Sequence, residues 1–264
     1  MRRVHLLELE DLPWVPSAVR DGGTDLLDLA FDRMGFYDGA TSKLLALIET
    51  TGASRVIDLC SGGGGGALSM RRRLRAAGCE VEITLTDRYP NADGAARVRA
   101  LNDPRTRYLA EPADAMRAAG DAPGVRTMYS AMHHFRPDDV TALVAAVVAR
   151  REPLAFFDVA ASPALRRVPL ALAPPAMAMN MLALFVGCLV ITPLARPLRA
   201  SRFALTYALP LIPALVAWDG TVSALRAYTA DEALALARAA PGADGYDWDA
   251  GVAGPALYLL GAPR

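Results

Sequence analysis

The chain has 264 residues, with 28 Lys or Arg against 28 Asp or Glu, so its formal net charge is zero. This balance excludes a global basic field that would draw the protein to nucleic acid or anionic lipid, although it leaves local patches open. The length suits one α/β domain with a sizeable insertion. The three cysteines form no CxxC pair, which argues against a disulfide scaffold and favours a reducing, cytoplasmic compartment.

The first 50 residues are predicted to form a cap segment ahead of the core. Residues 5–22 contain Pro13, Pro16 and the pair Gly22-Gly23, which indicates an irregular lead-in. The acidic residues at the start interrupt any apolar run before it reaches the length of a signal peptide. Helical spacing follows in TDLLDLAFDRM and TSKLLALIET, with Thr24 and Thr41 as the expected N-caps.

A strand and helix rhythm typical of parallel βα units then begins. Five short apolar runs are predicted strands, at 55–60, 81–87, 106–114, 125–132 and 153–160, and the helices between them are expected at 66–77, 91–101 and 137–151. Right-handed crossovers would arrange these strands in an open doubly wound sheet. Ligands of such sheets bind at the carboxyl ends of the strands.

The rhythm breaks after the fifth strand. Residues 168–192 and 203–218 carry no charge, and three arginines (Arg196, Arg199 and Arg202) separate them. Order returns with a helix at 229–240, capped by Thr229, and with YDWDAGVA and ALYLLGAP as an antiparallel edge hairpin. The expected fold is therefore a Rossmann-like, mostly parallel seven-stranded sheet. Its parts are a cap at 1–50, a cofactor-binding core at 51–161, an apolar helical insertion at 162–225 and the closing elements at 226–264.

The strongest local signal is VIDLCSGGGGG, a strand closed by Asp58 and followed by a glycine run. Glycine lets backbone N–H groups approach a ligand, and the next helix offers its positive end. The string Gly62-x-Gly64-x-x-Ala67 also fits the dinucleotide fingerprint, and a flexible turn is the structural alternative.

Acidic residues close the next two strands. Asp87 follows the glycine run at a distance suited to accepting hydrogen bonds from two ribose hydroxyls. Asp114 closes the third strand, where a carboxylate can accept from an adenine amino group. Each could instead be a helix N-cap or a solvated loop charge.

Together these residues resemble the class I S-adenosylmethionine-dependent methyltransferases. VIDLCSGGG resembles the first motif of that family, TLTD the second, AEPADAM the third and MYSAMHHF the fourth, over about residues 50 to 160. The resemblance implies S-adenosylmethionine as cofactor and S-adenosylhomocysteine as product, and it gives Cys60 the place of the first glycine of the family's loop. The implied cofactor-binding positions are Asp58, Cys60, Ser61, Gly62, Gly64, Asp87, Arg88, Ala113, Asp114, Ala115, Ser130 and Met132.

The catalytic candidates are His133, His134 and Asp158. A histidine after the fourth strand could deprotonate an attacking hydroxyl, amine or ring nitrogen, but in the resembled family such a pair often only shapes the pocket. The two histidines cannot both point inward along one extended segment. They lack a third ligand at metal-binding spacing, so no metal is expected. Asp158 closes the fifth strand and is the best-placed carboxylate for orienting a substrate.

Substrate contacts are expected from outside the core. The candidates are Trp14, Arg20, His134, Asp219, Arg226 and Tyr228, with ordinary packing and turn roles as the alternatives. The uncharged insertion would serve as a lid, a membrane-surface contact or a dimer contact, and each of these implies an apolar substrate or partner. Two full membrane crossings are disfavoured, because the closing elements must return to the side of the sheet.

The sequence therefore predicts methyl transfer to an O, N or C nucleophile of a small, apolar molecule. One alternative is an NAD(P)-dependent oxidoreductase, which could share the glycine turn and Asp87. It would lack a Tyr-x-x-x-Lys pair, since the only lysine, Lys43, precedes the first strand. The other is a non-catalytic, membrane-associated nucleoside-binding protein. The expected location is cytoplasmic, with peripheral contact at the inner face of the membrane as an option.

Overall fold

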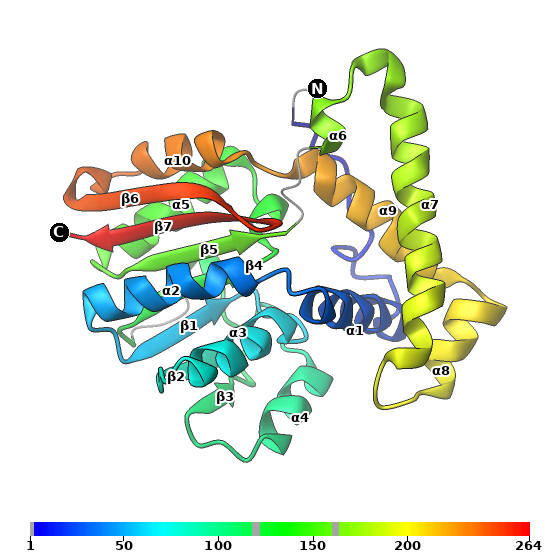
Figure 1. Ribbon diagram of the computed structural model, residues 1–264, viewed down its shortest axis with the longest axis horizontal. Helices are drawn as coiled ribbons and strands as arrows, with labels where there is room; N and C mark the ends of the chain where they lie inside the picture. Colours follow the sequence, from blue (N-terminus) through cyan, green and yellow to red (C-terminus); the bar gives the residue numbers. More distant parts are fainter. Residues whose placement is uncertain (1–2, 118–121, 160–163) are drawn as a thin grey trace. The chain divides into compact units, whose positions relative to one another are not determined.

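The computed structural model describes residues 3–117, 122–159 and 164–264 (Figure 1). The chain divides into two compact units. The first comprises Met1–Met34 and Ala160–Ala227, and the second comprises Gly35–Val159 and Tyr228–Arg264. The second unit holds the sheet, and the first holds the two long uncharged stretches, residues 168–192 and 203–218.

The second unit is built on a seven-stranded sheet in the order β3-β2-β1-β4-β5-β7-β6. Its strands are β1 Arg55–Leu59, β2 Glu82–Leu85, β3 Thr106–Tyr108, β4 Val125–Tyr129, β5 Leu154–Asp158, β6 Tyr246–Ala253 and β7 Ala256–Pro263. The first five run parallel, β7 is antiparallel to β5, and β6 pairs antiparallel with β7 at the edge. The predicted mostly parallel seven-stranded sheet is confirmed.

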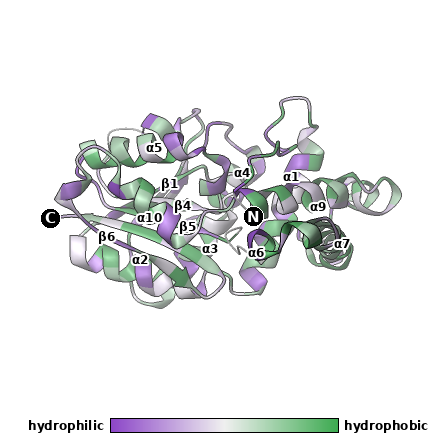
Figure 2. Ribbon diagram, turned by 90° about the horizontal axis from the view of Figure 1, so that it is seen from above, coloured by the Kyte–Doolittle hydropathy of each residue, from purple (hydrophilic) through white to green (hydrophobic). Residues whose placement is uncertain are grey.

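Helices cover both faces of this sheet. They are α2 Asp38–Thr51, α3 Gly65–Ala76, α4 Ala92–Ala100, α5 Pro137–Ala149 and α10 Ala230–Arg238, with short 3-10 turns η1 Ala115–Arg117, η2 Met132–His134 and η6 Ala243–Gly245. Helix α2 contacts α3, α5 contacts α10, and Figure 2 shows α2 and α5 on opposite sides of the sheet. Phe156 and Phe157 of β5 are fully buried between the layers. A sheet covered on both faces explains the continuous apolar runs of its parallel strands.

Two predictions for the second unit are wrong. The third strand ends at Tyr108 rather than at residue 114, because the chain turns there to donate from the Ala113 N–H to the carbonyl of Asp87. Thr41 is not an N-cap: α2 begins at Asp38, and the Thr41 hydroxyl donates to the Tyr37 carbonyl inside the helix. The other ends in this unit lie within three residues of the prediction.

Thr229 is an N-cap, as predicted. Its hydroxyl accepts from the Glu232 N–H, and the Glu232 carboxylate accepts from the Thr229 N–H, which forms a capping box at the start of α10.

The first unit is helical. Its elements are α1 Ser17–Arg33, α6 Ala164–Arg167, η3 Leu170–Leu172, α7 Ala173–Ile191, η4 Thr192–Leu194, α8 Ala200–Phe203, the π-helical turn η5 Ala204–Ala208 and α9 Leu211–Arg226. Its core gathers Val19 and Leu26 of α1, Cys188 of α7, and Ile212 and Val216 of α9. This unit contains the predicted apolar insertion, although the N-terminal residues expected to be a separate cap fold together with it.

The predicted irregular lead-in over residues 5–22 is wrong from Ser17 onward, where α1 begins. Thr24 is consequently an interior helix residue whose hydroxyl donates to the Arg20 carbonyl, and it is not an N-cap. The reason is tertiary packing. A Cβ at Gly22 would meet the Ile212 side chain at 2.5 Å, so the two glycines let α1 approach α9 closely and this contact outweighs their low helix propensity.

Gly66 marks an equally close approach in the second unit. A Cβ at Gly66 in α3 would clash with the Cβ of Tyr129 in β4. Gly66→Ala is therefore expected to lower the free energy of unfolding by about 1–3 kcal/mol, because a methyl group must be forced into a packed layer. Denaturant unfolding followed by circular dichroism measures this loss.

Gly245→Ala is the matched control in the same unit. Nothing lies within 4 Å of a Cβ at Gly245, so this variant should unfold like the wild type. Equal stability of the two variants would contradict the close contact between α3 and β4.

Candidate functional site

Hydrogen bonds to the Asp58 carboxylate hold the turn that follows β1. Its carboxylate is buried and accepts hydrogen bonds from the Ser61 hydroxyl at 2.6 Å and the Thr127 hydroxyl at 3.0 Å. Burial raises the pKa of Asp58 to about 7, while these two hydrogen bonds act in the opposite direction. Asp58 therefore ties the turn to β4, and both of its carboxylate oxygens have partners within the protein.

The turn itself needs left-handed backbone at three positions. Cys60, Gly62 and Gly64 have φ values of +58°, +49° and +86°. Glycine adopts this region without a Cβ penalty, which explains two of the three residues. Cys60 occupies the strained place where the resembled loop has a glycine.

The thiol of Cys60 has no sign of activation. Burial raises its pKa well above the ordinary value, and the nearby carboxylates of Asp87, Asp58 and Asp114 act in the same direction. A cysteine in this environment stays protonated and does not act as a nucleophile.

Asp87 joins the ends of the first three strands. One carboxylate oxygen accepts from the Gly62 N–H at 2.8 Å, and the other accepts from the Tyr89 N–H at 2.7 Å. The Tyr108 hydroxyl, from the end of β3, donates to the Gly62 carbonyl at 2.7 Å. Burial raises the pKa of Asp87, against the effect of the two N–H donors and of the His134 charge. Two carboxylate oxygens offer about four acceptor sites, so further hydroxyl groups can still bind.

The third strand's acidic residue lies in a more open position. Asp114 is exposed, and its Oδ1 accepts from the Met116 N–H at 3.0 Å at the start of η1. Ala115 is buried beside it, while Arg88 is exposed and places its guanidinium 5.7 Å from the ring centre of Tyr89. The observed contact of Asp114 is the local capping role that the sequence left as an alternative.

A second tight turn follows β4. Ser130 has a φ of +51°, and its hydroxyl lies 2.7 Å from the hydroxyl of Tyr37 and accepts from the Val159 N–H at 3.1 Å. Met132 is fully buried in the following turn. The expectation of an extended segment at the histidine pair is wrong, because residues Met132–His134 form a 3-10 turn. The turn brings the two imidazole rings to a centroid distance of 4.4 Å.

His133 and Asp158 form a buried pair. The Asp158 carboxylate accepts from the His133 backbone N–H at 3.0 Å and lies 2.9 Å from its Nδ1. Both side chains are almost fully buried. A carboxylate at Nδ1 fixes the imidazole tautomer, so the basic nitrogen is Nε2. Asp158 is thus directed at His133 rather than standing at an open pocket mouth.

The residues predicted to contact substrate have structural partners in their own units. In the first unit, Asp219 accepts from the Leu9 and Glu10 N–H groups, and Arg226 donates to the Leu6 carbonyl and pairs with Glu8. Arg20 donates to the carbonyls of Glu10 and Leu12, while Trp14 is 70% exposed. In the second unit, Tyr228 donates to the Phe135 carbonyl at 2.7 Å. Contacts of these five with a substrate stay predictions.

Three residues of the site were missed by sequence reasoning. Thr127, Tyr108 and Tyr37 supply hydroxyl groups to Asp58, to Gly62 and to Ser130. A polar threonine inside the buried run VRTMY was the only signal for Thr127. The two tyrosines gave none, because their partners depend on strand order.

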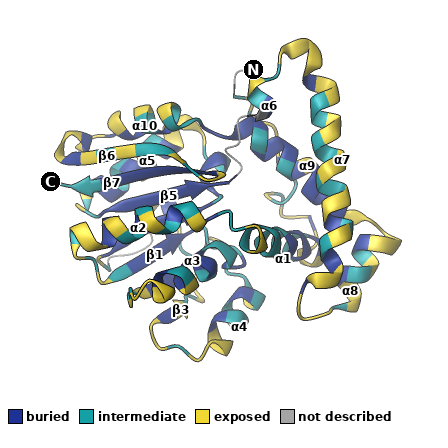
Figure 3. Ribbon diagram, viewed as in Figure 1, coloured by how far each residue is buried: buried dark blue, intermediate teal, exposed yellow. Residues whose placement is uncertain are grey.

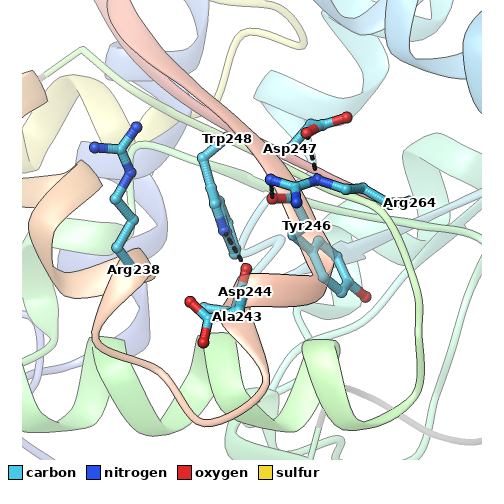
Figure 4. A pocket seen from close by; sticks show the side chains of 7 residues that line it. All are labelled: Arg238, Ala243, Asp244, Tyr246, Asp247, Trp248 and Arg264. Atoms are coloured by element: carbon cyan, nitrogen blue, oxygen red, sulfur yellow. Dashed lines mark hydrogen bonds and ion pairs between the residues drawn. The ribbon is translucent and has the colours of Figure 1, made fainter.

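A pocket of about 480 Å³ lies elsewhere in the second unit (Figure 4). It is lined by Arg238, Ala243, Asp244, Tyr246, Asp247, Trp248 and Arg264. The start of β6 and the end of β7 form part of it, and that end of β7 pairs with the beginning of β5. The pocket is therefore at the opposite edge of the sheet from the strand ends that carry Asp58 and Asp87.

The environment of Asp58 predicts a specific pH dependence of stability. Its folded-state pKa lies above the ordinary value of 3.8, so the folded chain retains a proton that the unfolded chain has lost. The resulting stabilisation is full at low pH and is lost as pH rises toward about 7. Between pH 5 and 7, the advantage of the wild type over Asp58→Asn should fall by about 1 kcal/mol per pH unit.

Urea unfolding at a series of pH values measures this difference. The exposed Asp244→Asn is the control, and its stability should run parallel to that of the wild type. A pH-independent gap between wild type and Asp58→Asn would show that Asp58 is not held protonated.

Comparison with known proteins identifies the fold. No protein-family model and no curated protein matches the sequence. An O-methyltransferase family protein from Burkholderia thailandensis is similar in structure, with a TM-score of 0.52 and 14% identity over 90% of this chain and 58% of that one. Human N-acetylserotonin methyltransferase, solved with S-adenosylmethionine, gives a TM-score of 0.51 and 14% identity over 99% of this chain and 63% of its own. The chain thus spans less than two thirds of either structure, and it has the Rossmann-like fold of the S-adenosylmethionine-dependent methyltransferases.

Proposed function

We propose that the protein is an enzyme that transfers a methyl group from S-adenosylmethionine to a hydroxyl oxygen of a small, apolar molecule. The observation that carries this proposal is the junction of the glycine turn with Asp87, which joins the ends of β1 and β2 through the 2.8 Å hydrogen bond at Gly62. A carboxylate beside a glycine turn is the donor and acceptor set that a nucleoside with a charged tail requires. The likeness to O-methyltransferases in fold supports the choice of cofactor and of an oxygen acceptor.

The residues of the turn fit the cofactor. Asp87 would accept from the ribose hydroxyls, the turn of Ser61, Gly62 and Gly64 would face the methionine end, and Asp114 would accept from the adenine amino group. Gly64 has a φ of +86°, and a Cβ there would meet the Leu85 side chain at 2.8 Å, so the observed turn favours glycine at this position. When bound, the sulfonium supplies an already activated methyl group, and the protein must mainly hold the acceptor in line with it.

His133 is the proposed general base, and Asp158 is its positioning residue. The acceptor hydroxyl must lose its proton during or after methyl transfer, and Nε2 of His133 can take it. The Asp158 carboxylate at Nδ1 holds the ring in the required tautomer and stabilises the imidazolium that results. His134, whose ring lies against that of His133, would shape the site.

The oxidoreductase alternative loses support in the structure. The only lysine, Lys43, lies in α2, where its Nζ is 2.9 Å from Asp249 and 4.3 Å from the ring centre of Tyr258. It is thus engaged with the hairpin of β6 and β7. Gly39 stands where a Tyr-x-x-x-Lys pair would need its tyrosine, so Lys43 cannot form that type of active site.

The other parts of the proposal follow from charge and cysteine chemistry. The balanced net charge favours a small-molecule acceptor over nucleic acid. The three cysteines are free thiols, which accords with a cytoplasmic location.

Asp87→Ala tests cofactor binding. The variant is expected to bind S-adenosylhomocysteine more weakly by about 1–3 kcal/mol, because the ribose loses charged hydrogen bonds. Isothermal titration calorimetry gives the affinity, and Asp138→Ala, an exposed position in α5, is the control. Unchanged affinity would refute the ribose assignment, and a wild type that binds neither S-adenosylmethionine nor S-adenosylhomocysteine would refute the function.

His133→Gln and Asp158→Asn test the base. His133→Gln should lower kcat by about 10²-fold or more while cofactor affinity is unchanged, since a general base contributes to the transition state rather than to binding. Asp158→Asn should also lower kcat and should move the pH–rate profile, because the amide no longer stabilises the charged imidazole. The readout is methylated product by mass spectrometry across a panel of hydroxylated aromatic compounds. An unchanged kcat in His133→Gln would refute the role of His133 as general base and would mean that the protein acts by aligning the acceptor with the methyl group.

A further inference from the structure

One helix of the first unit is almost entirely apolar. The segment Leu170–Leu194, which contains α7, has the length and composition of a membrane span, yet only 11% of its apolar 18-residue window is buried. Figure 3 shows α7 largely exposed or intermediate, and Figure 2 shows it coloured as hydrophobic. A soluble core helix with this composition would be mostly buried.

The exposed part of α7 is a continuous stripe. Its exposed positions recur in pairs every four residues: Pro174 and Pro175, Ala178 and Met179, Leu182 and Ala183, Val186 and Gly187, then Val190. Met179, Leu182 and Val190 are 66%, 56% and 68% exposed. The stripe is about 24 Å long at the helical rise, and no polar side chain interrupts it. We call it the α7 stripe.

The opposite side of α7 is occupied by the first unit itself. Asn180 donates to the Thr221 hydroxyl of α9 at 2.8 Å, and Cys188 is part of the core that α1 and α9 share. One face of α7 therefore packs against the rest of the first unit, and the opposite face, the α7 stripe, is exposed.

This attachment excludes a full membrane crossing by α7. Helix α9, which packs on it, carries Asp219, and Asp219 holds the N–H groups of Leu9 and Glu10. An inserted α7 would draw α9 and its bound acidic segment toward the hydrocarbon, at a large cost for each charge. A shallow contact of the α7 stripe with a surface involves no such burial.

The segment that carries the stripe contains no acidic residue of its own. No Asp or Glu occurs between Asp158 and Asp219 in the sequence, whereas this stretch contains five arginines, of which the buried Arg202 pairs with Asp25 of α1. Arg167 precedes α7 and Arg196 follows it, and both are exposed. The stripe is thus an apolar face with a cationic residue near each end, which is the pattern that binds anionic lipid surfaces.

The same charges disfavour a second copy of the chain as the occupant. An isologous contact through the stripe would bring the exposed Arg167 and Arg196 toward the same two residues of the second copy, and residues 159–218 supply no carboxylate between them. Tyr207, which is 49% exposed and donates its hydroxyl to the Leu189 carbonyl of α7, is an aromatic residue of the kind enriched at membrane interfaces.

We propose that the α7 stripe docks the protein on anionic lipid bilayers, as a surface contact that leaves α9 and residues 3–12 outside the hydrocarbon. The proposal stands apart from methyl transfer, since every residue that carries it belongs to the first unit.

Vesicle flotation of the full chain tests the contact. The protein should float with vesicles of phosphatidylcholine and phosphatidylglycerol, should float far less with phosphatidylcholine alone, and should be released as salt screens the arginines. The double variant L182E/V186E should partition at least about tenfold less, because two exposed apolar side chains become charged. Arg196→Glu should weaken binding to the anionic vesicles alone.

Val252→Glu is the matched control. Val252 is 67% exposed on β6 of the second unit, so the same kind of substitution should leave flotation unchanged. Circular dichroism checks that each variant is folded, as expected for substitutions at exposed positions.

Two results would overturn the proposal. One is a wild type that does not float with anionic vesicles, or a double variant that floats as well as the wild type. The other is a wild-type dimer in analytical ultracentrifugation that L182E/V186E converts to a monomer without any vesicle binding, which would make a second copy the occupant. S-adenosylhomocysteine binding, measured beside flotation, reports separately on the cofactor site.

Discussion

The buried carboxylate of Asp58 is the contact on which the candidate site depends. It lies at the end of β1 and holds Ser61 of the turn and Thr127 of β4 at once. Because the turn is held there, Gly62 can reach Asp87 on the neighbouring strand, and α3 can begin directly after the left-handed Gly64. Burial raises the pKa of the Asp58 carboxyl group to about 7, although its two hydroxyl partners act in the opposite direction.

Asp58, Asp87 and Asp158 lie at or just after the ends of three parallel strands. They differ in burial and in their hydrogen-bond partners. Asp58 is enclosed, and both of its oxygens serve the fold. Asp87 is half-buried and binds one N–H with each oxygen, so it combines a structural contact with unused acceptor sites. Asp158 is enclosed like Asp58 but faces an imidazole, so its charge acts through His133. The same side chain at the ends of three parallel strands thus anchors a turn at Asp58, has free acceptor capacity at Asp87 and holds an imidazole at Asp158.

The sheet could be predicted from the sequence because strands buried on both faces leave continuous apolar runs, and because Asp58 and Asp87 end such runs. Features that depend on residues far away in the sequence could not be predicted. Gly22 and Gly23 indicate a helix break by themselves, but they lie within α1 because α9 packs against them. The segment Met132–His134 is predicted as extended, but it forms a turn in which the His133 N–H donates to Asp158. Thr127 and Tyr108 contribute hydroxyls to the site through strand pairing, which no local pattern encodes.

The first unit, unlike the second, leaves a long apolar helix face exposed. Its helices bury Val19, Leu26 and Ile212 against one another, but α7 is apolar apart from Asn180, and the first unit covers only one side of it. An exposed apolar stripe of this length would promote aggregation unless something covers it. A lid, a second copy and a lipid surface would all cover it, but they differ in the charges they tolerate at its ends. Since residues 159–218 contain arginines and no carboxylates, an occupant that is both apolar and anionic suits the stripe, and the proposed bilayer containing acidic lipids meets both conditions.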